Sequence, residues 1–335
     1  MQAAIYGLEG MTMSASERDF FRDSDPSGYI LFRRNCSDPA QVLALTDALR
    51  NLSGRDDLPI LIDQEGGRVA RMRMPQWPDF PAAEKFALLY RAAPSSAIEA
   101  VRSNARALAL MLRAAGVNVD CLPLLDVRQP GATDIIGDRA LGEEPMQVAA
   151  LGRAVLDGLS SAGVVGVVKH MPGHGRALVD SHKELPVVSA SADELEIDIE
   201  PFERLNWAPM GMTAHVVYTA WDDERPASLS PTVIHDIIRK RIGFNGWLMS
   251  DDLGMEALQG DFGERAAGVV AAGCDVALHC SGRMVEMVAV AGAVPEMTAG
   301  GLERLERAMA SVNPEADGID FAEAIAKRDE LLALA

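Results

Sequence analysis

Residues 164–169 read VVGVVK and run directly into HMPGHG at residues 170–175. The first part is apolar almost throughout rather than alternating, which is typical of a strand covered on both faces of a parallel sheet. The second part is rich in turn residues and cannot continue a helix. This pattern predicts a buried strand that ends in a polar loop.

Similar β-type runs recur along the chain. They begin at Ala3 (AAIYG), Tyr29 (YILF), Pro59 (PILID), Val117 (VNVDCLP), Gly211 (GMTAHV), Gly246 (GWLMS) and Asp275 (DVAL). Helical patterns lie between them, with predicted starts at the capping boxes Ser96/Glu99 and Ser191/Glu194 and at Ser230 followed by Pro231. Eight alternating units predict an α/β fold, a single-domain (β/α)8 TIM barrel. An open doubly wound sheet is the weaker option, because no GxGxxG turn follows the first strand.

The 335 residues are expected to form one catalytic domain over 1–335, because no Pro-, Ser- or charge-rich linker divides them. The segment of about 301–335 has an amphipathic helical pattern, with Leu302, Leu305 and Met309 on one face. We expect it to pack on the barrel exterior.

The composition excludes several classes of protein. With 48% hydrophobic and 24% charged residues the chain is globular, and a net charge of -18 repels nucleic acid and anionic lipid. The start, MQAAIYGLEG, has no basic region before an apolar stretch, and no run reaches the roughly 20 apolar residues of a membrane span. We therefore expect a cytoplasmic protein. The four cysteines show no CxxC pair and are interpreted as buried free thiols.

Polar motifs follow five of the predicted strands: DQEGGRVAR, IIGDRALGEEP, KHMPGHG, TAHV and SDDLGM. In a barrel the carboxyl ends of the strands converge on one pocket, so these motifs mark a candidate site. Asp63, Arg71, Arg139, Lys169 and His170 would supply donors and acceptors around the rim, as a ligand dense in hydroxyl groups requires. Each of them alone is more typical of a surface ion pair. His215 ends a strand and is a candidate substrate-binding residue, whereas His235 and His279 are interpreted as structural.

Two acidic motifs offer catalytic groups. Asp180 and His182 are two apart in an extended segment, so the carboxylate can orient the imidazole for proton transfer; the alternative is a solvated loop with a chance spacing. Asp251 and Asp252 follow the apolar run GWLM. One can point into the barrel mouth while the other caps the next segment; the alternative is a helix cap with an ion-pair partner.

Together these motifs resemble the family 3 glycoside hydrolases, specifically the bacterial β-N-acetylhexosaminidases of the NagZ type. The similarity runs in consistent order from about Ala3 to Ser281. It implies Asp251 as nucleophile, His182 as general acid/base and Asp180 as the residue that orients it. It further implies that Asp63, Arg71, Arg139, Lys169 and His170 bind the sugar.

The resemblance implies a retaining exo-β-N-acetylglucosaminidase without metal or cofactor. The implied substrate is N-acetylglucosaminyl-1,6-anhydro-N-acetylmuramic acid or its peptide-bearing forms, in peptidoglycan recycling. Larger relatives carry the acid/base on a second domain, for which this chain has the Asp180–His182 loop instead. Met171 stands where the family usually has an aromatic residue and Gly254 where serine is common, which bears on fine substrate preference.

Several alternatives stay open. The substrate's 2-acetamido oxygen could replace Asp251 as nucleophile, and phosphate could replace water as acceptor. A metal-dependent barrel hydrolase would use Lys169, His170, His215 and Asp251 as ligands, but such barrels commonly place HxH after the first strand, where this chain has GLEG. A sugar-binding barrel is the non-enzymatic alternative. The sequence leaves open the oligomeric state, the natural aglycone and movement of residues 171–186.

Overall fold

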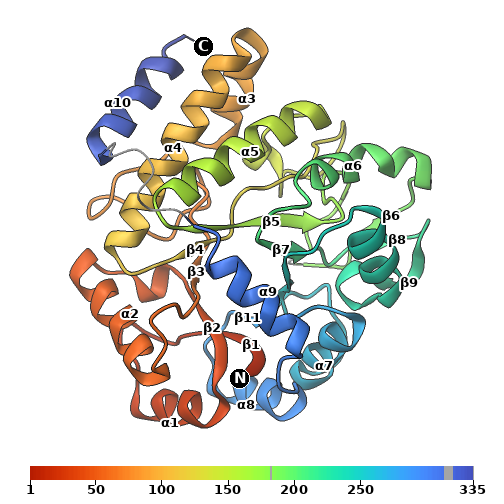
Figure 1. The fold of residues 1–335 in the computed structure, drawn as a ribbon. Coiled ribbons are helices and arrows are strands. Elements are labelled where there is room, and N and C mark those ends of the chain that lie inside the picture. The colour runs from red at the N-terminus through yellow and green to blue at the C-terminus, as the bar shows by residue number, and fades with distance from the viewer. Residues whose placement is uncertain (182, 313–319, 335) are drawn as a thin grey trace.

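Eight parallel strands close into a barrel in the order β1-β11-β10-β7-β5-β4-β3-β2 (Figure 1). The structure, a computed structural model, describes residues 1–181, 183–312 and 320–334. The barrel strands are β1 (Gln2–Gly7), β2 (Pro26–Leu31), β3 (Ile60–Ile62), β4 (Val119–Asp120), β5 (Val165–Met171), β7 (Met210–Thr213), β10 (Trp247–Asp252) and β11 (Val276–His279). Each lies within or beside a predicted run. Because β1 pairs with both β2 and β11, the sheet is closed, and the predicted TIM barrel is confirmed.

Helices surround the barrel and cover its outer face. They are α1 (Ala15–Ser24), α2 (Pro39–Ser53), α3 (Ala83–Ala92), α4 (Pro94–Ala114), α5 (Pro145–Ser161), α6 (Ala192–Arg204), α7 (Phe262–Ala272), α8 (Met284–Ala293), α9 (Ala299–Met309) and α10 (Phe321–Leu332). A π-helix spans Val233–Arg241, and short 3-10 helices cover Arg33–Asn35, Gly137–Arg139 and Ala227–Leu229. Within the described ranges, no helix is long and apolar enough to cross a membrane.

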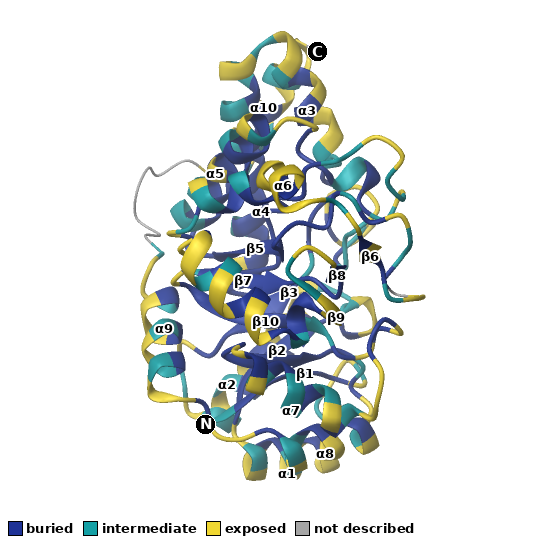
Figure 2. Ribbon diagram, turned by 90° about the vertical axis from the view of Figure 1, so that its right-hand side faces the viewer, coloured by how far each residue is buried: buried dark blue, intermediate teal, exposed yellow. Residues whose placement is uncertain are grey.

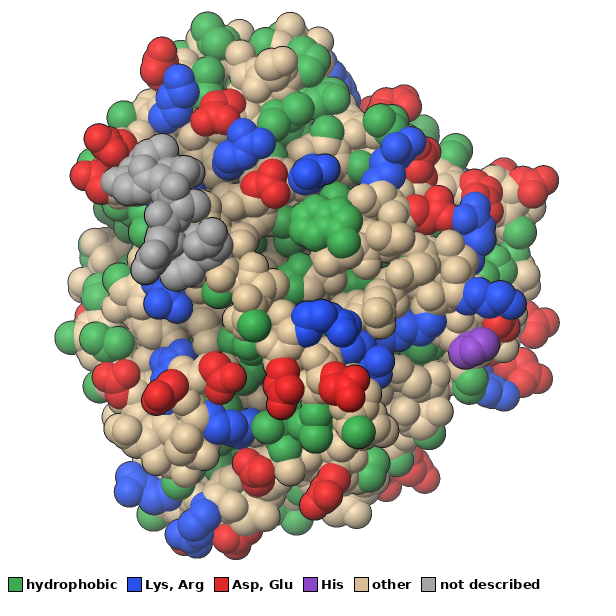
Figure 3. All heavy atoms as spheres, in the orientation of Figure 1, with side chains coloured by type: hydrophobic (Ala, Val, Ile, Leu, Met, Phe, Trp, Pro, Cys, Tyr) green, Lys and Arg blue, Asp and Glu red, His purple; other side chains and the backbone are tan. Residues whose placement is uncertain are grey.

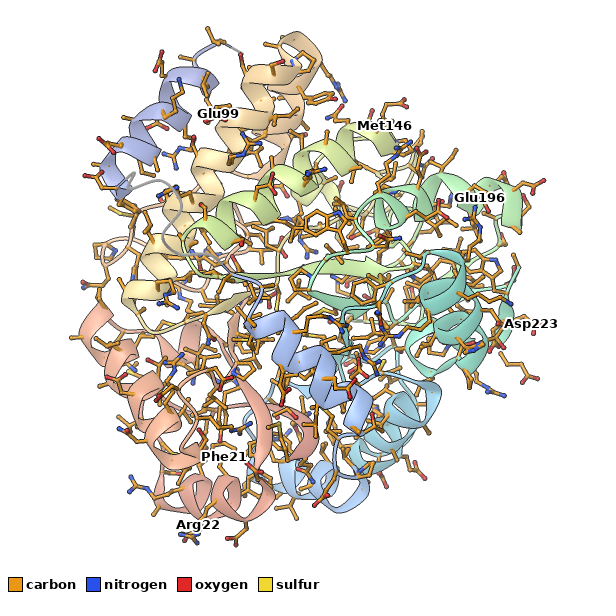
Figure 4. The ribbon with its side chains drawn as sticks, in the orientation of Figure 1. Phe21, Arg22, Glu99, Met146, Glu196 and Asp223 are labelled. Carbon is orange, nitrogen blue, oxygen red and sulfur yellow. The ribbon has the colours of Figure 1, made fainter. Side chains whose placement is uncertain are left out.

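The strands form the core because most of their side chains are apolar, with polar residues mainly toward their carboxyl ends. All seven residues of β5 are buried, and Figure 2 shows buried strands inside a layer of helices with exposed outer sides. On α1, Phe21 packs edge-on against Tyr29 at 4.8 Å between ring centroids, whereas the adjacent Arg22 points outward (Figure 4). One face of α1 therefore packs against the barrel through Phe21, while the opposite face is exposed to solvent.

The helix starts test local predictions. The capping box of Ser191 with Glu194 is confirmed. Ser230 Oγ accepts a hydrogen bond from Val233 N at 3.1 Å, and a helix begins at Pro231 as predicted, although it continues as a π-helix. The predicted start at Ser96 is wrong, because α4 already begins at Pro94. Proline suits the first helical position, having a helical φ and no N–H to leave unpaired.

The C-terminal helices α9 and α10 contact other elements of the chain through arginine side chains. From α9, Arg304 Nη2 lies 2.5 Å from Asp275 Oδ1 and Arg307 Nη2 donates to Asn245 O at 2.6 Å, both just before barrel strands. From α10, Arg328 Nη1 donates to Asn104 Oδ1 on α4 at 3.2 Å. The first helix therefore covers the amino ends of strands, and the second extends the helical layer.

A small sheet was not predicted. It consists of β6 (Val187–Val188), β8 (Val217–Tyr218) and β9 (Asp222–Pro226), in the order β6-β8-β9. The run GMTAHV was predicted as one strand, but the barrel strand ends at Thr213 and the chain turns into this sheet. Strands of two residues carry too little periodicity to be recognised. The sheet supports the loop after β5, because Tyr218 Oη donates to Gly173 O at 2.7 Å.

The four cysteines are free thiols. Cys121, Cys274 and Cys280 are buried and Cys36 is half-buried. Burial raises the pKa of Cys36 and of Cys274 to about 12, so these groups are protonated, unreactive thiols.

Candidate active site

A cavity of about 230 Å³ lies at the carboxyl ends of the barrel strands. Its wall contains Ile30, Phe32, Asp63, Glu65, Arg68, Val69, Arg71, Ile135, Ile136, Arg139, Lys169, His170, His174, Ser181, Met212, Asp251, Asp252, Met255, Leu278 and Cys280. These residues come from strand ends that are far apart in sequence and meet only because the barrel closes. Six predicted site residues are brought together here: Asp63, Arg71, Arg139, Lys169, His170 and Asp251.

One side of the cavity is a network of ion pairs, which we call the ion-paired wall (Asp63, Glu65, Arg71, Arg139 and Lys169). Lys169 Nζ lies 2.8 Å from both Asp63 Oδ1 and Glu65 Oε1. Arg139 donates through Nε and Nη2 to the two oxygens of Glu65, each at 2.8 Å. Arg71 Nη2 completes the network at 3.1 Å from Asp63 Oδ2.

The ion pairs keep the two carboxylates and the lysine of this wall charged. Burial opposes ionisation of Asp63 and Glu65, but the fields of Lys169 and the arginines outweigh it and hold both pKa values below the usual range. The same carboxylates overcome burial at Lys169 and raise its pKa. The wall therefore presents fixed acceptors and donors to a ligand.

The two aspartates of β10 have different environments. Asp252 Oδ1 accepts hydrogen bonds from Gly254 N and Cys280 N, each at 3.0 Å, so it caps the following segment. Asp251 lines the cavity, and its Oδ1 accepts a hydrogen bond from Asp252 N at 2.8 Å. Burial would raise the pKa of Asp251, but His170, His215 and the Asp252 N–H outweigh it and lower that pKa. Asp251 is thus an ionised carboxylate facing the cavity.

His215 lies beside the end of β10 and is not among the residues that line the cavity. It is fully buried, with Nε2 at 3.1 Å from Asp252 O and Nδ1 at 2.6 Å from Ser228 Oγ. Its contacts are thus with the carbonyl at the end of β10 and with the 3-10 helix Ala227–Leu229. They suit support of that strand end better than the predicted contact with a substrate.

The predicted Asp180–His182 pair falls partly outside the described residues, because these do not include His182. Asp180 is half-buried and does not line the cavity; its carbonyl accepts hydrogen bonds from Lys183 N and Glu184 N. Ser181, next along the chain, is buried and lines the cavity, with Oγ 3.2 Å from His174 Nε2.

Three site residues were not singled out from the sequence. Glu65 follows Asp63 by two positions, the same-side spacing of an extended segment, which could have identified it. His174 belongs to the motif KHMPGHG but was not predicted to have a role of its own. Burial lowers its pKa to about 4, and His170 adds to this effect. Asp126 sits in the apolar run LPLLDV, where no local signal distinguishes it, yet its Oδ2 lies 2.8 Å from His170 Nδ1.

A second cavity, of about 370 Å³, lies against α9 at the amino ends of β5, β7 and β10. The described residues that line this second cavity include no carboxylate and no imidazole. The face that carries α9 mixes acidic, basic and apolar side chains without a dominant charge (Figure 3). Among the described residues, no group of three or more His, Cys, Asp or Glu could hold a metal ion.

Comparison with known proteins connects this site to a family. The model of the glycosyl hydrolase family 3 N-terminal domain matches residues 3–313. A β-hexosaminidase of Methylococcus capsulatus is 38% identical over 312 residues, 92% of this chain and 87% of the relative. One from Alkalilimnicola ehrlichii is 40% identical over 282 residues, 83% of this chain and 80% of the relative.

The fold is also similar to solved structures. The crystal structure of NagZ from Neisseria gonorrhoeae in complex with N-trifluoroacetyl-D-glucosamine aligns with a TM-score of 0.88 at 31% identity, over 100% of this chain and 98% of that one. The family resemblance noted in the motifs is confirmed, and this chain belongs to glycosyl hydrolase family 3 and is a glycoside hydrolase.

Proposed function

We propose that this glycoside hydrolase is a retaining exo-β-N-acetylglucosaminidase. The names of its relatives and the ligand in the similar NagZ structure support an N-acylated glucosamine as the sugar. The cavity, at about 230 Å³, is smaller than the roughly 300–1,000 Å³ of sites for drug-sized ligands. This size supports release of one terminal sugar at a time.

The observation that carries the proposal is the ionised carboxylate of Asp251 in the wall of the cavity. In the proposed first step, Asp251 attacks the anomeric carbon, and the bond to the leaving oxygen breaks as a glycosyl-enzyme ester forms. The Asp252 N–H holds Asp251 Oδ1, so the carboxylate is oriented before the substrate binds.

The proposed acid/base is His182, oriented by Asp180; both roles rest on the family resemblance. Protonated His182 donates to the leaving oxygen in the first step. Neutral His182 then takes a proton from water, which attacks the anomeric carbon and frees Asp251. Two inversions give net retention. An imidazole suits both roles because its ordinary pKa lies near neutrality.

In this proposal the ion-paired wall binds the sugar hydroxyls. Asp63 and Glu65 accept hydrogen bonds, while Arg71, Arg139 and Lys169 donate them. Because these side chains already hold one another, little side-chain entropy is lost when the ligand binds. The wall would therefore select a ring with several hydroxyl groups at set positions.

The proposed natural substrate is N-acetylglucosaminyl-1,6-anhydro-N-acetylmuramic acid with or without its peptide. The proposed setting is peptidoglycan recycling in the cytoplasm. Both follow from the family resemblance. Release of N-acetylglucosamine from a purified muropeptide, detected by mass spectrometry, would test the substrate directly; turnover confined to aryl glycosides would contradict it.

The reaction itself is tested with aryl glycosides. We expect the wild type to release the chromophore from aryl β-N-acetylglucosaminide much faster than from aryl β-glucoside, with or without a chelator. Asp251→Ala should lose this activity while remaining folded. No turnover by folded wild type, or full activity in the variant, would contradict the proposal. Loss of activity on chelation would favour the metal-dependent alternative.

The covalent step and the acceptor need separate experiments. A fluorinated donor should trap an adduct on Asp251, found by peptide mass spectrometry, whereas substrate assistance by the acetamido group would leave none. Proton NMR should show the β-anomer as the first product. Added inorganic phosphate should yield no sugar phosphate if water is the acceptor.

A further inference from the structure

Asp126 lies directly behind the site and is not part of its wall. It follows β4, is fully buried, and accepts three hydrogen bonds from the segment KHMPGHG. Its Oδ1 accepts from His170 N at 3.2 Å and from His174 N at 2.7 Å. Its Oδ2 lies 2.8 Å from His170 Nδ1. One carboxylate thus contacts both the backbone and an imidazole of the segment that spans the end of β5 and the loop after it.

The charge of Asp126 determines which nitrogen of His170 carries a proton. Burial alone would raise the pKa of Asp126, but the contacts with His170 and His174 outweigh it and lower that pKa to about 2. At neutral pH the group is therefore a carboxylate, which can only accept hydrogen bonds. The short contact then requires the proton on His170 Nδ1.

We propose that Asp126 is a positioning residue that fixes His170 in the Nδ1-protonated tautomer, so that Nε2 offers a lone pair to a substrate hydroxyl. This assignment rests on the proposed function for the identity of the ligand. His170 lines the cavity, whereas Asp126 does not. Asp126 therefore acts on the substrate only through the imidazole.

Lys169 makes this arrangement chemically selective. An ammonium has three N–H donors, and Asp63 and Glu65 occupy two of those of Lys169. Within the part of the chain that the structure describes, the third has no partner at hydrogen-bond distance, so it can donate to a ligand. Neighbouring residues thus present one donor and one acceptor, which matches hydroxyl groups, since a hydroxyl both donates and accepts. An ether or a fluorine at that position could satisfy only the donor.

Asp126→Asn tests the tautomer without removing the backbone contacts. The amide oxygen must face His170 N and His174 N, because the amide nitrogen would place donors against donors there. The amide nitrogen then faces His170 Nδ1, which has to become an acceptor. The proton of neutral His170 moves to Nε2, and the cavity meets a donor in place of the acceptor.

The first readout is spectroscopic and independent of activity. Two-bond ¹H–¹⁵N spectra distinguish the tautomers of a neutral histidine, and His170→Gln assigns the signal among the six histidines. Above neutral pH we expect the proton on Nδ1 in the wild type and on Nε2 in Asp126→Asn. A wild-type His170 protonated on Nε2 would overturn the inference, whatever the variant does.

The second readout is kinetic. In Asp126→Asn we expect kcat/KM for aryl β-N-acetylglucosaminide to fall about 10- to 100-fold, the scale of losing the outer partner of a ligating histidine. For a substrate analogue that lacks the hydroxyl group bound by His170, kcat/KM should differ little between wild type and variant, because both bind this analogue equally poorly. Unchanged kcat/KM in a variant with the switched tautomer would refute the role in substrate binding.

Asp275→Asn is the matched control. Asp275 is also buried and accepts a backbone hydrogen bond, from Leu248 N at 2.9 Å, but it pairs with Arg239 and Arg304 away from the cavity. We expect it to lower stability while leaving the His170 spectrum and kcat/KM unchanged. If the wild type turned over no aryl β-N-acetylglucosaminide, the proposed function would fail, whereas the NMR result would still decide the tautomer.

Discussion

The ion-paired wall and the β10 side of the same cavity hold their carboxylates in opposite ways. In the wall, Asp63 and Glu65 are each in contact with two cations at 2.8–3.1 Å. On the β10 side, the Asp251 carboxylate accepts a hydrogen bond from the backbone N–H of Asp252, and His215 contacts both the end of this strand and Ser228.

Because of this difference, the ion-paired wall is suited to binding the ligand and the β10 side is suited to nucleophilic attack. A carboxylate whose charge is balanced by two cations is a poor nucleophile, although it can still accept a hydrogen bond from a ligand. A carboxylate held by neutral donors is ionised and keeps an oxygen for an electrophile. Substitutions on the two sides should therefore affect different properties.

The largest expected effect is on the β10 side. Asp251→Asn should lower kcat by about 10⁴-fold, the scale of losing one catalytic group, while changing the free energy of unfolding by less than about 1 kcal/mol. Steady-state kinetics and urea unfolding measure the two. Asp252→Asn keeps an oxygen for Gly254 N and Cys280 N and serves as the adjacent control. Equal losses in both variants would contradict the distinction.

On the ion-paired wall the expected effect is on stability. Glu65→Gln removes a carboxylate that pairs with both Arg139 and Lys169, and the free energy of unfolding should fall by about 3 kcal/mol. Urea unfolding checks this. Glu99→Gln, which breaks the exposed pair with Arg102 on α4 (Figure 4), should cost less than about 1 kcal/mol. A similar cost in both would mean that the wall contributes no more than a surface pair.

As the pH falls, the free energy of unfolding should decrease first because of His174, before the carboxylates of the ion-paired wall become protonated. The folded pKa of His174 is about 4 against an ordinary 6.5, so as pH falls through this window the unfolded chain binds the proton first. Because of His174, the free energy of unfolding should decrease by about 3 kcal/mol as the pH falls from about 6.5 to about 4. Asp63 and Glu65 stay ionised there because their pKa values are lowered. Urea midpoints across the window measure the slope, and His174→Gln should flatten it; an unchanged slope would count against this assignment.

The smallest expected effect concerns the support behind β10. A glutamine amide nitrogen can occupy the place of His215 Nε2 and still donate to Asp252 O, whereas an asparagine amide reaches only toward Ser228. His215→Asn should lower kcat about tenfold with little change in KM, the scale of one hydrogen bond, and His215→Gln should lose less. A rise in KM alone would instead favour the direct substrate contact predicted from the sequence.

The fold could be predicted from the sequence because strand and turn signals are local. VVGVVK and the other apolar runs each mark a barrel strand, and their number and alternation with helices indicate closure. The prediction failed where local signals are weak or compete. Val187–Val188 is too short to show a period, and Pro94 begins α4 before the capping box at Ser96.

The site was partly predictable for the same reason. Asp63, Lys169, His170 and Asp251 lie at or directly after the carboxyl ends of barrel strands, so their convergence follows from barrel geometry alone. Asp126 also follows a strand, but its burial against His170 depends on how two loops pack. His215 follows a strand as well, yet it does not line the cavity, and its contact with Ser228 depends on how the chain returns after β8 and β9.

The sequence by itself determined the barrel, the family and the strand ends that carry chemistry, because these depend on local pattern and composition. Only the tertiary structure decided which charges are paired. Glu65 meets Arg139 across 74 positions of sequence, and Asp126 meets His170 across 44. Such contacts arise only when strands distant in sequence become neighbours in the closed barrel, and burial there makes each pairing strong enough to control pKa, tautomer and reactivity.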